Sequence, residues 1–266
     1  MASSRYVCAA LVLAGSLTPA CAADPAPEEP SPPSSLLPGS ASTPPTGSAT
    51  PQTPAPQKPG ATGPNAEVVH LYMHGRDNTD WYCTGTLVSA TVVVTAAHCL
   101  DPEMFDAFEV TALGATGTPR ASGADARVFG GPYEDVANPD VGILKLSTPI
   151  QLAEYATLTD VVARVDSGGV KGSAVVRTEE KLDSSFGPTA PMSVRSAVPY
   201  GYEHGFATPL FSKGGDSGAG LFLVEGGQRT KKLIGVGRQP EQARKLDHFT
   251  RVDAAFVAWF KAQTGT

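Results

Sequence analysis

Two short segments, far apart in the chain, carry side chains that can act together only if the fold brings them side by side. The segment 95–99, TAAHC, supplies His98, and the segment 214–218, GGDSG, supplies Ser217 more than a hundred residues later. A serine hydroxyl is a poor nucleophile at neutral pH, and it becomes competent when an imidazole accepts its proton during attack. His98 and Ser217 are therefore a candidate catalytic pair.

The imidazole of such a pair needs a carboxylate that holds its second nitrogen, because this contact fixes the tautomer and stabilises the imidazolium. Asp140 is the best candidate, since it directly precedes the apolar run 141–146, VGILKL. Asp135 is a rival, but no apolar strand follows it. Taken singly, each residue also has a purely structural interpretation: His98 as a buried histidine, Asp140 as a turn carboxylate and Ser217 as a small residue in a glycine-rich turn. Their joint presence favours a catalytic triad of His98, Asp140 and Ser217.

The three segments, in the order His, Asp, Ser, resemble the trypsin/chymotrypsin-like serine proteases. The TAAHC motif is intact, the strand after Asp140 is close to the family pattern, and GDSG stands at 215–218. The order discriminates, because other folds arrange the same triad differently along the chain. The resemblance covers the chain from about Glu67 to its end. It implies that the backbone N–H groups of Gly215 and Ser217 form an oxyanion hole, and that Cys83 and Cys99 form a disulfide.

Short apolar runs separated by glycine and proline favour an all-β fold for residues 67–266. The resemblance implies two six-stranded antiparallel β-barrels with the active site between them. Only the end of the chain reads as a helix, over 253–263, with Asp253 placed to cap it. The expected strands cover residues 68–73, 84–89, 91–96, 108–113, 141–146, 174–177, 220–224, 233–236 and 249–252.

The composition of the first 66 residues predicts a leader followed by a linker. Residues 1–22 have a basic residue, an apolar run and a small-residue end, as in a secretory signal peptide. Cleavage before Cys21 with lipid attached to its sulfur, as in bacterial lipoproteins, is the alternative to simple export. Residues 23–66 are rich in Pro, Ser, Thr, Ala and Gly, and we expect a disordered linker. The protein is therefore expected to be secreted or held in the cell envelope, with a possible membrane tether through lipidated Cys21.

The chain has a net charge of −6, which argues against nucleic acid as a partner. The basic residues Arg229, Lys231 and Lys232 lie between two expected strands and most simply solvate a hairpin. No cluster of ligands indicates a metal or an organic cofactor, so none is expected. The expected partner is a protein or peptide substrate, and we expect a monomer.

The region around Asp216 departs from the family. In most members a newly released N-terminus pairs with the aspartate before the nucleophile, but Pro59 and Gly60 stand where its aliphatic residues would be. A buried carboxylate without a partner is costly, so another cation or hydrogen bonds must hold Asp216. Arg177 and Lys213 are the candidates.

The substrate pocket is also atypical. Phe211 stands at the position where trypsin has the aspartate that receives Arg or Lys. Asp247 falls near another wall of the pocket, where a carboxylate could still select a basic residue, although a solvated loop charge is the preferred interpretation. Gly237 belongs to the strand that would pair with extended substrate, and Pro240 in that strand lacks an N–H.

Two functions follow from these observations. The first is an exported serine endopeptidase that works through an acyl-enzyme. The second is a non-catalytic binding protein on a protease fold, with an esterase as a minor third possibility.

Overall fold

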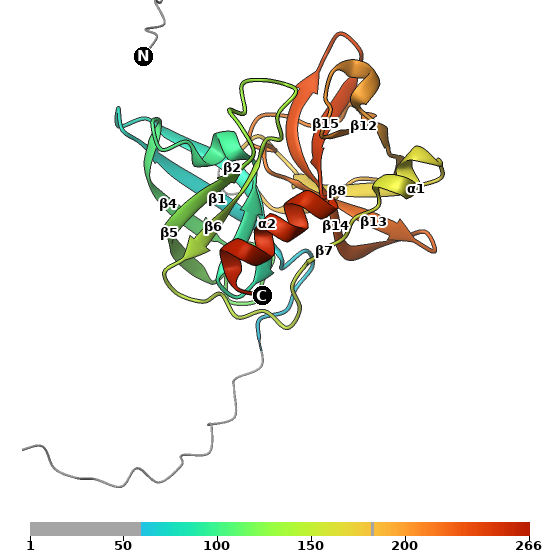
Figure 1. Cartoon of the computed structure of the whole chain (residues 1–266). Coiled ribbons are helices and arrows are strands. Elements are labelled where there is room, and N and C mark those ends of the chain that lie inside the picture. The colour runs from blue at the N-terminus through green and yellow to red at the C-terminus, as the bar shows by residue number, and fades with distance from the viewer. Residues whose placement is uncertain (1–59, 182–183) are drawn as a thin grey trace, which may run out of the picture. The chain divides into compact units, whose positions relative to one another are not determined.

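The computed structural model describes residues 60–181 and 184–266 (Figure 1). The expected signal peptide, Cys21 and the linker up to residue 59 lie outside the described residues. Among the described residues, no helix is both long enough and apolar enough to cross a membrane.

The N-terminal half of the described chain is a closed antiparallel barrel of six strands, with spatial order β1-β2-β3-β6-β5-β4. The alternation of side chains along these strands buries Leu71, Leu87 and Leu144 in the barrel interior. The strands are β1 (Val68–Gly75), β2 (Asp80–Ser89), β3 (Val92–Thr95), β4 (Phe105–Thr111), β5 (Arg120–Phe129) and β6 (Val141–Leu146).

The C-terminal half is a sheet of nine strands with the path β10-β8-β13-β14-β15-β12-β11; β7 pairs with β14 and β9 with β8. Its longer strands are β8 (Lys171–Arg177), β12 (Gly205–Pro209), β13 (Gly220–Glu225), β14 (Gln228–Glu241) and β15 (Leu246–Arg251). The short ones are β7 (Thr157–Leu158), β9 (Phe186–Pro188), β10 (Met192–Ser193) and β11 (Arg195–Ser196). The short helix α1 (Val162–Asp166) lies between β7 and β8.

The expectation of an all-β fold with a C-terminal helix is confirmed, but the pairing path of this second half does not close. The two-residue strands β10 and β11 stand at its two edges, and within the described residues they are not paired with each other.

The two halves share an apolar core that the C-terminal helix completes. Helix α2 (Ala254–Thr264) begins after Asp253, whose Oδ1 accepts the N–H of Phe256 at 2.9 Å, as a capping residue does. The fully buried Phe256 packs against Phe129 of β5, with ring centroids 5.5 Å apart, and belongs to a cluster with Phe222 of the sheet. The two halves are therefore held in a fixed relation by this shared core.

The expected boundary between linker and domain, after residue 66, is too late. The N–H of Ala61 donates to the carbonyl of Gln151 at 2.7 Å, and the N–H of Thr116 donates to Thr62 at 2.7 Å. Ala66 is already buried in the barrel core. These hydrogen bonds and this burial hold residues 60–66 against the domain, although their composition resembles that of the linker.

Candidate active site

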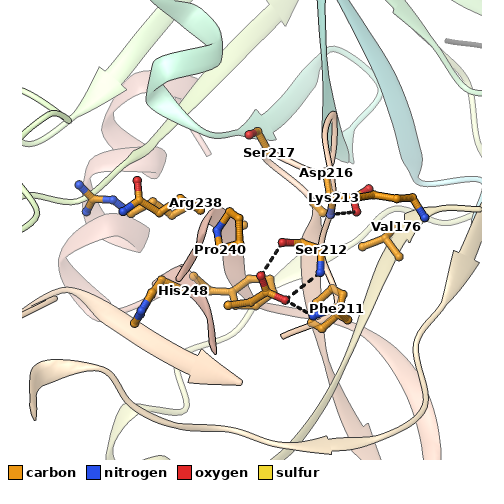
Figure 2. A pocket seen from close by; sticks show the side chains of 14 residues that line it. Val176, Phe211, Ser212, Lys213, Asp216, Ser217, Arg238, Pro240 and His248 are labelled. Atoms are coloured by element: carbon orange, nitrogen blue, oxygen red, sulfur yellow. Dashed lines mark hydrogen bonds between the residues drawn. The ribbon is translucent and has the colours of Figure 1, made fainter. Parts of the chain in front are cut away.

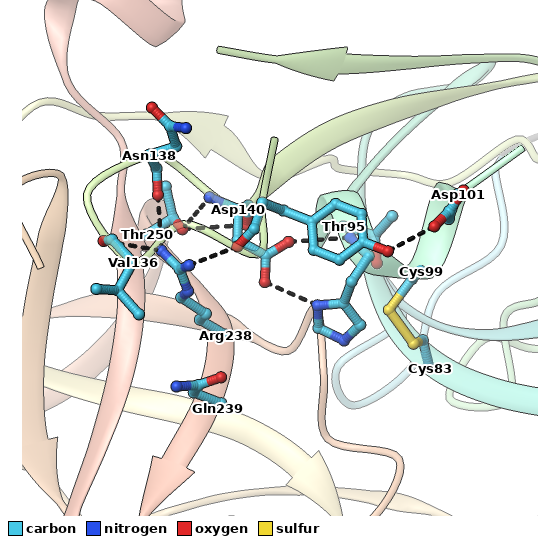
Figure 3. Close-up of polar contacts among 12 residues, drawn as sticks. Cys83, Thr95, Cys99, Asp101, Val136, Asn138, Asp140, Arg238, Gln239 and Thr250 are labelled. Atoms are coloured by element: carbon cyan, nitrogen blue, oxygen red, sulfur yellow. Dashed lines mark hydrogen bonds and ion pairs between the residues drawn. A yellow bond between two sulfur atoms is a disulfide. The ribbon is translucent and has the colours of Figure 1, made fainter. Parts of the chain in front are cut away.

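His98 and Asp140 are brought together by the pairing of β3 with β6. Thr95 of β3 is registered with Gly142 of β6 in an antiparallel pair. The chain that leaves β3 and the chain that enters β6 therefore meet at the same edge of the barrel. His98 lies in the 3-10 turn that follows β3, and its Nδ1 is 2.7 Å from Oδ2 of Asp140 (Figure 3). The backbone N–H of His98 donates to the other carboxylate oxygen at 3.0 Å.

Asp140 is itself held by the second half of the molecule. Its residue is only 2% exposed, and its backbone N–H donates to Oγ1 of Thr250 in β15 at 3.0 Å. The Thr250 hydroxyl donates in turn to the carbonyl of Asp140 at 3.0 Å. Thr250 thus fixes the backbone of Asp140, while the carboxylate accepts from the backbone N–H of His98 and contacts its Nδ1. This arrangement sets the orientation of the imidazole, which is what a triad requires.

The disulfide Cys83–Cys99 is present, as expected. It ties the turn that carries His98 to β2, within which Cys83 lies. A ring nitrogen of His98 and the two sulfurs lie within 4.8 Å of one another, but both sulfurs are consumed in the disulfide and cannot act as thiolate ligands.

Ser217 lies in a tight turn that glycine makes possible. Gly215 and Gly218 have φ angles of +85° and +80°, a region that residues with a side chain rarely adopt. A Cβ on Gly215 would come within 2.2 Å of the ring of Tyr82. The carbonyl of Ser217 accepts the N–H of Thr84 at 2.8 Å, so the turn is docked against β2 of the barrel.

The backbone N–H groups expected to form the oxyanion hole are unclaimed. Within residues 60–181 and 184–266, neither the N–H of Gly215 nor the N–H of Ser217 makes a hydrogen bond. The neighbouring amides are all used: those of Lys213, Gly214, Asp216 and Gly218 each have an acceptor. The turn thus leaves two donors beside the serine for a developing negative charge.

Ser217 and His98 are not joined by a hydrogen bond among the described residues. The imidazole keeps about 30% of its side-chain surface exposed, and Ser217 is half-buried. Catalytic hydrogen bonds are often long in proteins without substrate and tighten when substrate binds. The structure therefore assembles two of the three triad members through direct contact and leaves the third on the facing turn.

Asp216 is held mainly by backbone donors. Its residue is 3% exposed, and its two carboxylate oxygens accept the N–H groups of Arg177 and Lys213, each at 3.0 Å. Burial raises the pKa of this carboxyl, while the two N–H groups and the charges of Lys213 and Arg177 oppose that rise.

The Arg177 guanidinium is fully buried against the same turn. Its Nε donates to the carbonyl of Gly215 at 3.3 Å, its Nη2 donates to that of Cys83 at 3.3 Å, and its Cζ lies 4.6 Å from the centre of the Tyr82 ring. Burial lowers the pKa of Arg177 to about 10, although the charge of Asp216 opposes this shift. Arg177 therefore supplies both a backbone donor and a nearby positive charge to Asp216.

The expected pocket residues line one cavity beside Ser217 (Figure 2). Phe211, Gly237 and Asp247 all contribute to its walls. Asp247 is 2% exposed, so the preferred interpretation of a solvated loop charge is wrong. Its carboxylate accepts the N–H groups of Phe211 at 2.7 Å and Ser212 at 2.9 Å, and also the hydroxyl of Ser212.

The trypsin family profile matches residues 59–198, more than half of the chain. The chain belongs to the trypsin family. The matched residues include His98 and Asp140 and end before Ser217, whose place in the family rests on the GDSG motif and the fold. A search of curated proteins finds no match.

Solved structures of the family show the same fold at low sequence identity. HL collagenase has a TM-score of 0.60 and 17% identity, over 78% of this chain and 97% of its own. The thermostable serine protease AL20, from an extremophilic microorganism, has a TM-score of 0.61 and 14% identity, over 76% of this chain and 98% of its own. The scabies mite inactivated protease paralogue S-I1 has a TM-score of 0.57 and 20% identity, over 77% of this chain and 99% of its own. The likeness thus extends to a relative described as inactivated, so the fold alone does not decide activity.

Arg238 supports the candidate active site of this member of the trypsin family, although no motif in the sequence predicts this role. It lies on β14, is 7% exposed, and uses its guanidinium to bind the loop that leads into Asp140 (Figure 3). The accepting carbonyls are those of Tyr133, Asp135, Val136 and Asn138, at 2.7 to 3.4 Å. The signal in the sequence is an arginine directly after the apolar run 233–237, LIGVG, and its acceptors lie about a hundred residues earlier.

Tyr133 links the same loop to the turn that carries His98. Its hydroxyl donates to Oδ2 of Asp101 at 2.5 Å, and its ring centre is 6.1 Å from that of His98. Burial, together with Asp101, raises the pKa of the tyrosine hydroxyl. The tyrosine therefore stays a protonated donor, and the Asp140 loop and the His98 turn are coupled.

Proposed function

We propose that this protein is a serine endopeptidase. Ser217 attacks the peptide carbonyl, His98 accepts its proton and returns it to the leaving amine, and Asp140 orients the imidazole. The N–H groups of Gly215 and Ser217 bind the oxyanion of the tetrahedral intermediate. Water then hydrolyses the acyl-enzyme with His98 again acting as base. The observation that carries the proposal is the 2.7 Å contact between Nδ1 of His98 and the buried carboxylate of Asp140, and the two unclaimed amides support it.

We further propose that the enzyme is exported. The leader at residues 1–22 supports this, and so does the Cys83–Cys99 disulfide, because such bonds persist in oxidising compartments. Cleavage after Ala22 and attachment of lipid to Cys21 give different N-terminal masses. Mass spectrometry of the exported protein distinguishes the two, and an unprocessed N-terminus in the cytoplasm would contradict export.

The competing function is a binding protein on an inactive protease fold. The missing hydrogen bond between Ser217 and His98, among the described residues, is the observation on its side. Against it stands the preservation of all three triad groups and of both oxyanion donors, which a binding surface does not require.

Labelling with a fluorophosphonate probe decides between these functions. Such probes react with an activated serine, so stoichiometric modification at Ser217 is expected at neutral pH, and His98→Ala should abolish it. Asp135→Asn is the matched control, because this rival carboxylate makes no side-chain contact with His98, and labelling should persist. An unmodified Ser217 across neutral pH would favour the binding protein. Cleavage of a peptide amide, rather than of an ester alone, then separates a peptidase from an esterase.

A further inference from the structure

The peptide bond between Gly214 and Gly215 carries one of the two N–H groups that we propose as oxyanion donors. Among the described residues, neither the carbonyl of Gly214 nor the N–H of Gly215 makes a hydrogen bond. The orientation of this peptide is therefore not set by hydrogen bonds of its own. A half-turn of the peptide would direct the Gly214 carbonyl, instead of the Gly215 N–H, toward the oxyanion, and two adjacent glycines offer little steric resistance to it.

The peptide bonds on either side of this one are both held. The Gly215 carbonyl accepts hydrogen bonds from Oγ1 of Thr84 at 2.8 Å and from Nε of Arg177 at 3.3 Å. On the other side, the N–H of Gly214 donates to Oε1 of Glu180 at 3.0 Å. A half-turn of the peptide between them shifts both neighbours, so these contacts oppose it.

The two sides of this clasp differ in burial. Thr84 and Arg177 are fully buried, whereas Glu180 is exposed. Within residues 60–181 and 184–266, the N–H of Gly214 has no acceptor other than the Glu180 carboxylate. Loss of this one side chain therefore leaves one end of the peptide without support, while the other end stays held.

The segment that follows β8 brings Glu180 to the turn. Arg177, the last residue of β8, donates its backbone N–H to Oδ1 of Asp216 at 3.0 Å, and its Nη1 donates to the carbonyl of Lys181 at 2.9 Å. The same arginine thus contacts the turn and fixes the segment that carries Glu180 beside it. Glu180 then reaches Gly214, 34 positions later in the chain.

Gly214 has freedom that the observed conformation does not need. Its φ lies outside the left-handed region, and a Cβ on it would meet only Oε1 of Glu180, at 3.5 Å, which is an ordinary contact. Gly215, by contrast, has a φ of +85° and no room for a Cβ. The Glu180 carboxylate therefore restrains a position that glycine leaves mobile.

We propose that Glu180 is a positioning residue of the oxyanion hole. Its carboxylate holds the N–H of Gly214 and thereby keeps the N–H of Gly215 directed at the reacting carbonyl. The proposal rests on the proposed peptidase function and adds a residue that acts on the same site through the backbone.

Glu180→Ala removes the acceptor and tests the proposal. For a peptide amide that the wild type cleaves, we expect kcat to fall by about 20-fold, less than the loss that follows removal of an oxyanion donor itself. KM and the thermal unfolding midpoint should be nearly unchanged. The rate of inactivation by the fluorophosphonate should fall by a similar factor, because its phosphoryl oxygen occupies the oxyanion position.

Three further variants separate positioning from other effects. Glu180→Gln keeps an oxygen acceptor on a side chain of the same length, so it should retain most of kcat. Glu179→Ala is the matched control, since this exposed carboxylate pairs with Lys181 at 2.7 Å, and kcat should stay at the wild-type value. Adding Gly214→Ala to Glu180→Ala should recover part of kcat, because alanine restricts the backbone that the carboxylate no longer holds.

The outcomes keep the two proposals distinct. Wild-type kcat and a wild-type inactivation rate in Glu180→Ala overturn the inference and leave the peptidase function standing. Equal losses in Glu180→Ala and Glu180→Gln, or no recovery when Gly214→Ala is added, also overturn it. A wild-type Ser217 that the fluorophosphonate does not label removes the peptidase function, and the inference falls with it.

Discussion

The carboxylates of Asp140 and Asp216 are almost equally buried but are held in different ways. Asp140, 2% exposed, contacts the imidazole of His98, whose charge changes in the proposed mechanism. Asp216, 3% exposed, accepts two backbone N–H groups and lies near the fixed charge of Arg177. The carboxylate that has a role in the proposed chemistry thus contacts a titratable imidazole, whereas the carboxylate that shapes the turn accepts backbone N–H groups, which do not titrate near neutral pH.

Asp140→Asn gives the largest effect in this comparison. The amide can no longer stabilise the imidazolium and favours the wrong tautomer, so we expect kcat to fall by about 10⁴-fold with the fold intact. Steady-state kinetics and a thermal unfolding curve measure the two quantities. An equally large loss from Asp135→Asn would contradict the assignment of the third triad member.

Arg177→Met probes the other carboxylate. It leaves Asp216 buried beside fewer compensating charges and removes the Nε donor from the Gly215 carbonyl. We expect the free energy of unfolding to fall by about 3–5 kcal/mol, and kcat to fall by about 10²-fold because the oxyanion turn relaxes. Urea denaturation and kinetics test this.

The matched control for Arg177 is Lys213→Met, since Lys213 also lies near Asp216 but is half-buried. Its effect on stability should stay below about 1 kcal/mol. Combining Arg177→Met with Asp216→Asn should recover part of the lost stability, because the unpaired charge is removed. Full activity and unchanged stability in Arg177→Met would exclude Arg177 as the support of this turn.

The sequence predicted residues that stand in contiguous motifs better than contacts between distant segments. His98, Asp140 and Ser217 stand in contiguous motifs, and the Cys83–Cys99 disulfide follows from the resemblance. Contacts between distant segments could not be read. Arg229 was expected to solvate a hairpin, but its Nη1 binds the buried Glu67 at 2.8 Å, 162 positions earlier.

The strand β5 was missed for a different reason. Only Ala121 of its ten residues is buried, so the segment lacks the apolar alternation that marks a strand. Barrel closure, with β4 on one side and β6 on the other, stabilises it instead. The second half was also harder to predict, because several of its strands have only two or three residues and carry no periodic signal.

Like Asp140 and Asp216, His70 is a buried titratable group, and its burial makes the stability of the fold depend on pH. This histidine of β1 is 6% exposed, its Nε2 lacks a hydrogen-bond partner among the described residues, and its ring centre lies 6.2 Å from that of Tyr82. Burial, reinforced by the charge of Arg177, lowers its pKa from 6.5 to about 4. In the unfolded chain, His70 therefore binds a proton below about pH 6.5. In the folded protein, it does so only below about pH 4.

Stability should consequently fall as the pH decreases from 6.5 to 4, with a contribution of about 3 kcal/mol from His70. His70→Gln should flatten this part of the stability curve. Equal slopes in wild type and His70→Gln, measured by urea denaturation at several pH values, would contradict the assignment.

We expect the smallest effect on kcat from a substitution of Arg238, because Arg238 acts on Asp140 only through the loop that precedes this aspartate. Arg238→Gln removes the donors to four backbone carbonyls and loosens the position of Asp140, so we expect kcat to fall by about 10-fold with KM nearly unchanged. Arg238→Lys should restore part of kcat, since an ammonium can reach some of the same acceptors. The control is Arg229→Gln on the same strand, which loses its bond to Glu67 and should lower stability without changing kcat. If Arg238→Gln lowers stability and leaves kcat intact, as Arg229→Gln is expected to do, Arg238 is a structural residue and Asp140 is positioned by Thr250 and His98 alone.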